Sequence, residues 1–391
     1  MTMATDRAPV IAGLGITEMG KVYGRTAPEF AADAVRLAVS DAGLELHEVD
    51  GLLTNTGITG DVGLGLQRDL GLRHLRLLSE VQAYGSSAGA MVQYAAMAVA
   101  SGMADVVACV FADAPLKDKS TGGGAAYAGA GRRLTGWQGL TAASGIYSAN
   151  TMYALAARRH MQTYGTTSEQ LGHIAVAQRA WAARNPLAQM RDPITLEDHQ
   201  SSRWIAEPFH LLDCCLVSNG GVAVVVTSAD RAADLAQPAV HILGWGQAHP
   251  GYVMGRDSEF GLVSGAALSG PTALKMAGVT IADIDVAELY DCYTYTALIS
   301  LEDYGFCAKG EGGPFVAGGV LGPEGSLAVN TGGGQLSSYY MWGMTPLSEA
   351  VIQARGQGGE RQAPRNDLVL VSGNGGLLDH HSTLVLSPHA R

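Results

Sequence analysis

The chain has 391 residues, which suits two fused units, each with its own buried sheet. Apolar residues make up 47% of the chain, charged residues only 16%, and the 52 glycines favour a globular protein with close backbone packing. The formal net charge of -11 and the absence of a long basic run disfavour nucleic-acid binding, and no run of 18 apolar residues predicts a membrane span.

Five cysteines are an odd number, and no two of them form a CxxC pair. This pattern predicts neither a disulfide framework nor a zinc site, so we expect no metal in this chain. The first ten residues also lack the apolar run of a secretion signal. Together these features favour the reducing cytoplasm.

The first half of the chain predicts alternating strands and helices. We expect a strand at residues 9–14, a helix from Pro28 to the terminating Gly43, a strand at 49–54 and a helix of small residues at 90–100. A more polar stretch at about 115–210 carries predicted helices at 150–164 and 168–184, the second capped by Thr167. We interpret this stretch as an insertion that covers a site, followed by a strand at 221–226.

The second half repeats the order of the first: a strand at 239–245, a helix ending within 273–279 and a strand at 284–289. Residues 42–50 align with 277–285 over nine positions without a gap, which indicates an internal repeat. Duplicated units of this kind predict an α/β fold with parallel-rich sheets covered by helices. We therefore expect an N-terminal unit at 1–238, including the insertion, and a C-terminal unit at 239–391.

Several glycine-rich stretches invite a nucleotide-binding interpretation. Gly13-Leu-Gly15 follows a strand, but the third glycine of a GxGxxG motif would fall at Glu18, whose charge would repel a pyrophosphate. The stretches at 122–131 and 310–319 lack a following Lys-Ser/Thr, so we expect flexible loops. The sequence thus disfavours a nucleotide cofactor.

Ser86 and Ser87 stand in a turn before the small-residue helix, where a nucleophile would meet the positive end of the helix dipole. No GxSxG elbow surrounds them. Helix capping is therefore the favoured interpretation.

Two segments of the second half contain several tyrosines, and the first of them is dense in ionisable groups. Residues 288–295, reading Glu-Leu-Tyr-Asp-Cys-Tyr-Thr-Tyr, end a predicted buried strand, and strand carboxyl ends are where chemistry gathers in open α/β folds. Residues 330–343 contain three consecutive glycines that bring the backbone close to a ligand or to a packed helix. Core packing and catalysis both fit these clusters.

Separated motifs follow one another along the chain: Asp-Ala-Gly-Leu before Val-Asp-Gly, Gly102-Met-Ala-Asp-Val-Val107, Glu288-Leu-Tyr-Asp-Cys-Tyr293, Gly305-Phe-Cys-Ala-Lys-Gly-Glu-Gly-Gly-Pro314 and the stretch 330–343. In the content and order of these motifs, the chain resembles, essentially from end to end, the sterol-carrier-protein-type branch of the thiolase superfamily. The resemblance implies a thiolase fold of two similar βαβαβαββ halves in a five-layered α-β-α-β-α sandwich, with a helical insertion in the first half.

The same resemblance places the family's catalytic positions on unusual residues. The nucleophilic cysteine position falls at Gly85, and the C-terminal turn at 372–376 holds no second cysteine. The asparagine or histidine of one catalytic motif falls at Tyr290, and the histidine of the GHPxG loop at Tyr340. Asn219 stands where relatives commonly have Asp, in a structural turn. Claisen condensation through an acyl-enzyme is therefore not supported.

With this pattern, the chain is similar to the lipid-transfer-protein-2 aldolases, which cleave the side chain of steroid CoA thioesters by a retro-aldol reaction. The resemblance implies that Tyr290 and Tyr340 are the acid/base pair of this reaction. We expect Tyr340 to take the hydroxyl proton and Tyr290 to protonate the enolate carbon, with the reverse assignment open. Supporting candidates are Asp291, Asn330 and His381, and the glycines of the turns that can supply N–H donors are Gly85, Gly333 and Gly375.

A tyrosine base near neutral pH needs a stabilised anion, because a free phenol has a pKa of about 10. His381, near the C-terminal turn, is a candidate to assist, but two adjacent histidines on a loop are more often solvated. Two other hypotheses stay open: a degenerate thiolase with a nucleophile such as Ser86, and a non-catalytic, CoA-binding thiolase-like subunit. The released fragment, propionyl-CoA or acetyl-CoA, is not fixed by the sequence.

The resemblance also implies partners. Relatives of the aldolase group work with a small zinc-ribbon and OB-fold protein of the DUF35 family, so we expect zinc only in that partner and no cofactor in this chain. A homodimer is implied as well, within a heterotetramer that contains two DUF35 subunits.

Overall fold

The computed structural model describes residues 7–59, 62–119, 135–146, 148–251 and 259–390. Ten strands of these residues form one hydrogen-bonded sheet in the order β10-β9-β11-β12-β8-β1-β7-β4-β2-β3. Their bounds are β1 Pro9–Ile16, β2 Gly51–Asn55, β3 Leu77–Glu80, β4 Val106–Asp113, β7 Gly220–Ser228, β8 Val240–Ala248, β9 Val286–Glu288, β10 Ala328–Val329, β11 Val369–Gly375 and β12 His380–Ser387.

The sheet consists of two similar five-stranded halves that join where β1 pairs with β8 in antiparallel orientation. In each half, the three strands farthest from this join run parallel to one another, and the two strands nearest the join are antiparallel neighbours. The sheet therefore contains both parallel and antiparallel strand pairs, whereas the sequence predicted mainly parallel pairs. The interval between β7 and β8 contains the expected unit boundary near residue 238.

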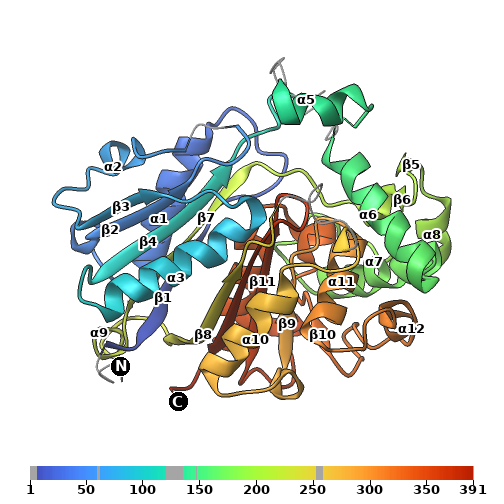
Figure 1. Ribbon diagram of the computed structural model, residues 1–391. Coiled ribbons are helices and arrows are strands. Elements are labelled where there is room, and N and C mark those ends of the chain that lie inside the picture. Colours follow the sequence, from blue (N-terminus) through green and yellow to red (C-terminus); the bar gives the residue numbers. More distant parts are fainter. Residues whose placement is uncertain (1–6, 60–61, 120–134, 147, 252–258, 391) are drawn as a thin grey trace.

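Helices complete five layers, as the fold class predicts (Figure 1). Helix α1 (Ala27–Ala42) packs on β1, β7 and β4, and α10 (Ala266–Ala277) packs on β8 and β12. Between the halves lie α3 (Ser87–Ala100) and α13 (Met344–Ala354), each of which contacts strands of both halves. The turns before and after these central helices are therefore held between the two halves of the sheet. Shorter helices are α2 (Leu66–Asp69) and α9 (Ala229–Ala232).

The internal repeat seen in the sequence is a structural repeat. Helix α1 ends at Gly43 (φ 75°) and α10 ends at Gly278 (φ 70°), both in the left-handed conformation that glycine adopts without strain. In both halves a short 3₁₀ turn follows, and then the parallel strand β2 or β9. The nine aligned positions thus mark equivalent helix ends.

The Gly-x-Gly pair near the N-terminus has a packing role. A Cβ added at Gly13 or Gly15 would lie 2.1 Å from a carbonyl oxygen of α1. In the second half, Gly244 and Gly246 of β8 approach α10 in the same way, at 2.2 and 2.3 Å. These glycines let a helix lie directly on its strand, which explains the motif without a nucleotide.

The insertion packs against the second half of the chain. Its elements are α5 (Gly136–Ala143), α6 (Ala149–Tyr164), α7 (Ser168–Ala183), α8 (Leu196–Ser201), β5 (Trp204–Ala206) and β6 (Phe209–His210). Helix α7 contacts α11 (Thr294–Tyr304) and α12 (Gly312–Ala317), as the green and orange helices at the right of Figure 1 show. The predicted N-cap of α7 is confirmed, because Thr167 Oγ1 accepts from Gln170 N–H.

The expectation of a flexible loop at 310–319 was wrong, because these residues contain α12. Its Gly313 leaves space for Gln170 of α7, whose Oε1 would lie 2.2 Å from an added Cβ. The other glycine-rich stretch, 122–131, lies outside the described residues. No helix in the described part of the chain is long and apolar enough to cross a membrane.

Candidate active site

Tyr290 and Tyr340 meet at one site between the two halves. Their hydroxyl oxygens are 3.1 Å apart, so either hydroxyl can donate to the other. Tyr290 follows β9 by two residues and its side chain is only 3% exposed, whereas Tyr340 is half-buried. The backbone N–H of Tyr340 donates to Ser218 Oγ at 3.1 Å, which ties this tyrosine to the first half. The fold thus brings together two residues that the sequence separates widely.

The ring of Tyr290 occupies the space beside Gly85. A Cβ added at Gly85 would lie 2.2 Å from a ring carbon of Tyr290 and 2.2 Å from the carbonyl oxygen of Asn374. Gly343 packs on the Gly85 carbonyl in turn, and Gly375 packs on the Ala83 carbonyl. The space beside position 85 therefore cannot hold both a side chain at that position and the ring of Tyr290.

Asp291 and Asn330 hold the segment that carries Tyr290. The fully buried carboxylate of Asp291 accepts from the N–H of Gln335 at 2.9 Å and of Leu336 at 3.3 Å, in the π-helical turn Gly334–Ser338 before Tyr340. Burial raises the pKa of Asp291 to about 7. Asn330 Oδ1 accepts from the N–H of Leu289 at 2.6 Å. Both residues thus connect the two tyrosine-bearing segments through the backbone.

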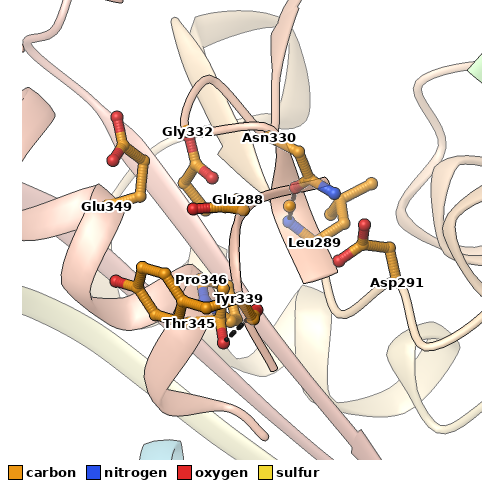
Figure 2. A pocket seen from close by; sticks show the side chains of 11 residues that line it. Glu288, Leu289, Asp291, Asn330, Gly332, Tyr339, Thr345, Pro346 and Glu349 are labelled. Atoms are coloured by element: carbon orange, nitrogen blue, oxygen red, sulfur yellow. Dashed lines mark hydrogen bonds between the residues drawn. The ribbon is translucent and has the colours of Figure 1, made fainter. Parts of the chain in front are cut away.

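A small cavity adjoins the segment that carries Tyr290. It is lined by Glu288, Asp291, Asn330, Tyr339 and Glu349 among others, while neither Tyr290 nor Tyr340 lines it. Figure 2 shows Glu288 between Glu349 and Asn330. Acidic side chains from the residues on either side of the Leu289–Tyr290 pair, Glu288 and Asp291, thus line a cavity that neither Tyr290 nor Tyr340 lines.

The structure does not bring His381 or Gly333 to the tyrosine hydroxyls. His381 lies on strand β12, fully buried, and its Nε2 is 3.0 Å from both Tyr304 Oη and Ser372 Oγ, so the expectation of a solvated loop histidine was wrong. Gly333 packs against Ala182 of α7, and its N–H donates to the Asn330 carbonyl within its own turn. Neither residue is placed to act directly on a substrate at the pair.

Burial of His381 predicts a pH dependence of stability. Desolvation lowers the pKa of His381 from 6.5 to about 3, so the folded protein keeps a neutral imidazole that the unfolded chain protonates. The contribution of His381 to the free energy of unfolding should therefore be fully present above pH 6.5 and be lost by up to about 1.4 kcal/mol per pH unit as pH falls toward 3. Urea unfolding of the wild type and His381→Asn at several pH values measures this contribution, and equal slopes would contradict it.

The expected capping role is wrong for Ser86. Ser86 occupies the N-cap position of α3, but its side chain makes no capping hydrogen bond. Ser87 Oγ instead accepts from the N–H of Ala83 at 2.7 Å, which closes the turn that contains Gly85. The buried Ser86 hydroxyl has no hydrogen-bond partner among the described residues, so no base is in place to activate it.

Strained backbone, which the sequence did not reveal, concentrates around the pair. In the described part of the chain six non-glycine residues have φ between 48° and 69°. This left-handed conformation is energetically unfavourable for such residues, and residues that adopt it are often found at functional sites. All but His74 lie in the turns beside Gly85, Gly375 and the two tyrosine-bearing segments: Tyr84, Asn330, Trp342, Leu377 and Leu378.

Trp342 is the bulkiest of these strained residues, and no sequence motif marks it. Its ring stacks on Phe111 of the first half, with 5.0 Å between ring centroids. Tyr84, half exposed, lies 6.1 Å from the Trp342 ring. Residues 330–343 stand out in the sequence by their glycines and tyrosines. A sequence does not show that a bulky aromatic residue within such a stretch adopts a left-handed conformation.

Asn219, the departure noted in the sequence, is a structural residue. Its side-chain amide donates to the carbonyl oxygens of Val22 and Leu116 at 2.8 and 2.7 Å and accepts from Leu116 N–H.

In the described ranges no group of three or more His, Cys, Asp or Glu residues is arranged to hold a metal ion.

The chain is similar to one protein family and, over nearly its full length, to two enzymes that act on steroid compounds. Residues 246–388 match the thiolase C-terminal domain-like family. A steroid side-chain-cleaving aldolase of Thermomonospora curvata is 40% identical over 380 residues, which are 94% of this chain and 95% of that protein. A 17-hydroxy-3-oxo-4-pregnene-20-carboxyl-CoA lyase of Mycobacterium tuberculosis is 40% identical over 386 residues, 95% of this chain and 98% of that protein.

Solved structures agree with this relation. The Ltp2-ChsH2(DUF35) aldolase superposes with a TM-score of 0.86 at 39% identity, covering 98% of both chains. A monomeric SCP2-thiolase-like protein from Mycobacterium smegmatis has a TM-score of 0.75 at 19% identity, over 99% of this chain and 78% of that one, and shares the fold.

Proposed function

The chain belongs to the thiolase superfamily, in the group that contains the steroid side-chain-cleaving aldolases, and from this premise we propose that it is a retro-aldol carbon–carbon lyase. Its substrate is a steroid 3-hydroxyacyl-CoA. The observation that carries the proposal is the contact between the Tyr290 and Tyr340 hydroxyls, over a Gly85 that leaves no space for a nucleophilic side chain.

The proposed reaction needs acid/base groups and no covalent intermediate. A base takes the proton of the 3-hydroxyl, the C2–C3 bond breaks, and its electron pair forms the thioester enolate while C3 becomes a ketone or aldehyde. An acid then delivers a proton to C2, which gives a short acyl-CoA such as propionyl-CoA. Acyl transfer to the protein has no part in this sequence, in agreement with glycine at position 85.

In this mechanism Tyr340, the more accessible tyrosine, takes the hydroxyl proton, and Tyr290 protonates the enolate carbon. The hydrogen bond between the two phenols stabilises the anion of either one and passes a proton between them. Asp291 and Asn330 act as positioning residues, because their contacts are to the backbone of the two tyrosine-bearing segments.

We propose that the enzyme works in the cytoplasm as a homodimer with two DUF35-type subunits. A solved relative is an aldolase whose title names a DUF35 protein, which supports this choice of partner. Zinc is then expected in the partner alone, and the CoA thioester is substrate rather than cofactor. Strand β3 is an edge of the sheet, and such an edge is a place where a second copy can add its own strand.

An exposed apolar face of α3 also supports the homodimer. Tyr94, Met97 and Met103 of this region are 39–50% exposed, which is unusual for clustered apolar side chains on a monomer. We expect Met97→Asp to shift the molar mass in light scattering from dimer toward monomer, because a charge there would be desolvated at the interface. A matched change at exposed Met276 of α10 should leave the dimer intact. A monomeric wild type would contradict the assignment.

The function is tested by substrate cleavage with the partner present. The chain is co-expressed with a DUF35 protein and given a panel of steroid 3-hydroxyacyl-CoA thioesters that differ in ring system and side-chain length. We expect equal amounts of a steroid ketone and a short acyl-CoA from at least one of them. CoA binding without turnover of any panel member, with every partner present, would instead favour a non-catalytic subunit.

The alternative of a thiolase-like acyltransferase predicts an acyl group on Ser86 or another nucleophile. Mass spectrometry of the intact protein after incubation with acyl-CoA detects such an adduct. The burial of Ser86, and the absence of a hydrogen-bonded base beside it in the described residues, disfavour this alternative.

A further inference from the structure

Two glutamates share a buried hydroxyl group, and one of them precedes Tyr290 by two residues in the chain. Glu288 is the last residue of β9 and Glu349 lies on α13, and they are 1% and 6% exposed. Between them, the fully buried Thr331 has its Oγ1 2.7 Å from Glu288 Oε1 and 3.1 Å from Glu349 Oε1. Thr331 N–H also donates to Glu288 Oε1 at 3.0 Å.

The two carboxyl groups differ in what compensates their charge. Arg361 donates to both oxygens of Glu349, at 2.9 and 3.2 Å, and Gln353 Nε2 donates to Glu349 Oε1 at 3.0 Å. Glu288 receives no such cation among the described contacts. Burial, reinforced by the nearby Glu349, raises the pKa of Glu288 well above its ordinary value.

The number of available protons also indicates that one of the two glutamates is protonated. The Thr331 hydroxyl has one proton, so it can donate to only one of the two carboxyl oxygens that lie within hydrogen-bond distance. If both glutamates were ionised, one carboxylate oxygen would face the hydroxyl oxygen without a proton between them. Protonation of one carboxyl supplies the missing donor, and the arginine contact keeps Glu349 as the ionised one.

We propose that Glu288 is a neutral carboxylic acid in the folded protein and acts as a positioning residue for Tyr290. The proton completes a chain that runs from Glu288 through Thr331 to Glu349 and Arg361. Because this chain contains one anion and one cation, it adds no net charge beside the segment that carries Tyr290.

The contacts explain how this acid positions the tyrosine. Glu288 binds Thr331, Leu289 N–H binds Asn330, and Asp291 binds the N–H of Gln335, so residues on both sides of Tyr290 are fixed to the turn that leads to Tyr340. Ionised Glu288 would repel Glu349 and loosen this attachment. The other titratable groups that face Glu288 are Asp291 on its own segment and Tyr339, whose hydroxyl contacts Ser348 Oγ at 2.7 Å.

A direct test detects the proton itself. The infrared difference spectrum between wild type and Glu288→Gln at pH 7 should contain the carbonyl band of one neutral carboxyl group, lost in the variant. Thermal unfolding gives an independent readout. Since the folded state binds the proton more tightly than the unfolded chain, the contribution of Glu288 to the free energy of unfolding should decrease as pH rises above the ordinary glutamate pKa of about 4.3, and the difference between wild type and variant isolates it. Glu288→Gln should flatten this decrease.

Activity separates positioning from a merely structural role. Glu288→Gln keeps a neutral group that can donate to Thr331, so we expect turnover within about threefold of wild type at pH 7 and a weaker loss at alkaline pH. Glu288→Ala removes the attachment and should lower kcat by about tenfold or more with little change in KM. Asp303→Asn, at an acid of α11 whose side chain is 2% exposed and whose pKa burial also raises, should leave the shape of the activity profile unchanged.

This proposal is independent of the lyase assignment in its first two readouts, because they need no substrate. The absence of a neutral carboxyl band, together with equal pH slopes of wild type and Glu288→Gln, would overturn it even in an active lyase. A glutamine variant as inactive as the alanine variant would refute the positioning role.

Discussion

Tyr290→Phe and Tyr340→Phe are each expected to lower kcat for steroid side-chain cleavage by at least about 100-fold, the contribution typical of a positioned acid or base. Each substitution removes only a hydroxyl group, and with it one end of the 3.1 Å contact between the two phenols. The steady-state rate of ketone release measures the effect. Substrate binding should change much less, because neither ring is removed.

Tyr339→Phe is the matched control for this pair. Tyr339 precedes Tyr340 directly, is 3% exposed and bonds Ser348 rather than the other phenols of the site. Its loss should cost about 1 kcal/mol of stability with kcat nearly unchanged. Full activity of both Tyr290→Phe and Tyr340→Phe would remove the tyrosines from the mechanism.

Gly85→Ala is expected to lower activity by at least about 100-fold and to destabilise the fold by about 1–3 kcal/mol, the usual range for overpacking a close-packed interior. The new methyl group would lie 2.2 Å from both the Tyr290 ring and the Asn374 carbonyl oxygen. Tyr290 must then leave its contact with Tyr340. Ketone release together with urea unfolding gives both effects.

A double-mutant cycle identifies the cause. In a Tyr290→Ala background, Gly85→Ala should cost less stability, with a remainder from the Asn374 carbonyl oxygen. Gly65→Ala is the control, because an added Cβ there meets no atom within 4 Å and the backbone already has a helical φ of -59°. Additive effects of the Gly85 and Tyr290 changes would show that the ring does not occupy the space we assign to it.

Much of the fold could be predicted from the sequence because the repeat is local. Gly43 and Gly278 end equivalent helices, and the nine residues aligned at each place carry the same helix end, turn and strand start. Thr167 likewise caps α7 through its own near neighbours. Such signals depend on residues a few positions apart, so they can be read without tertiary structure.

The structure shows where the predicted site residues lie, and it places some of them away from the tyrosine pair. The order of the family motifs along the chain aligned Tyr290 and Tyr340 with catalytic positions of the thiolase family. The structure brings the hydroxyl groups of these two tyrosines together. His381 was predicted to be solvated, but it is buried because β12 extends through it and its side chain meets Tyr304 of a distant helix. Gly333 was predicted as an N–H donor, but the fold turns it toward the insertion.

The steric link between Gly85 and Tyr290 could not be predicted at all. These residues belong to different halves of the chain, and only the packing of α3 between the two halves of the sheet brings the Gly85 turn against the end of β9. The same holds for the strained Trp342 and its stack on Phe111. Contacts between halves depend on the tertiary fold, which leaves no local pattern.

Cleavage in deuterium oxide tests the central claim most directly. The enzyme and its DUF35-type partner are given a steroid 3-hydroxyacyl-CoA, and the products and the intact protein are analysed by mass spectrometry. A retro-aldol lyase that uses Tyr290 and Tyr340 should release a steroid ketone and an acyl-CoA with one deuterium at C2, while the protein mass stays unchanged. An acyl group on the protein, or product formation that persists when both tyrosines are phenylalanine, would contradict it.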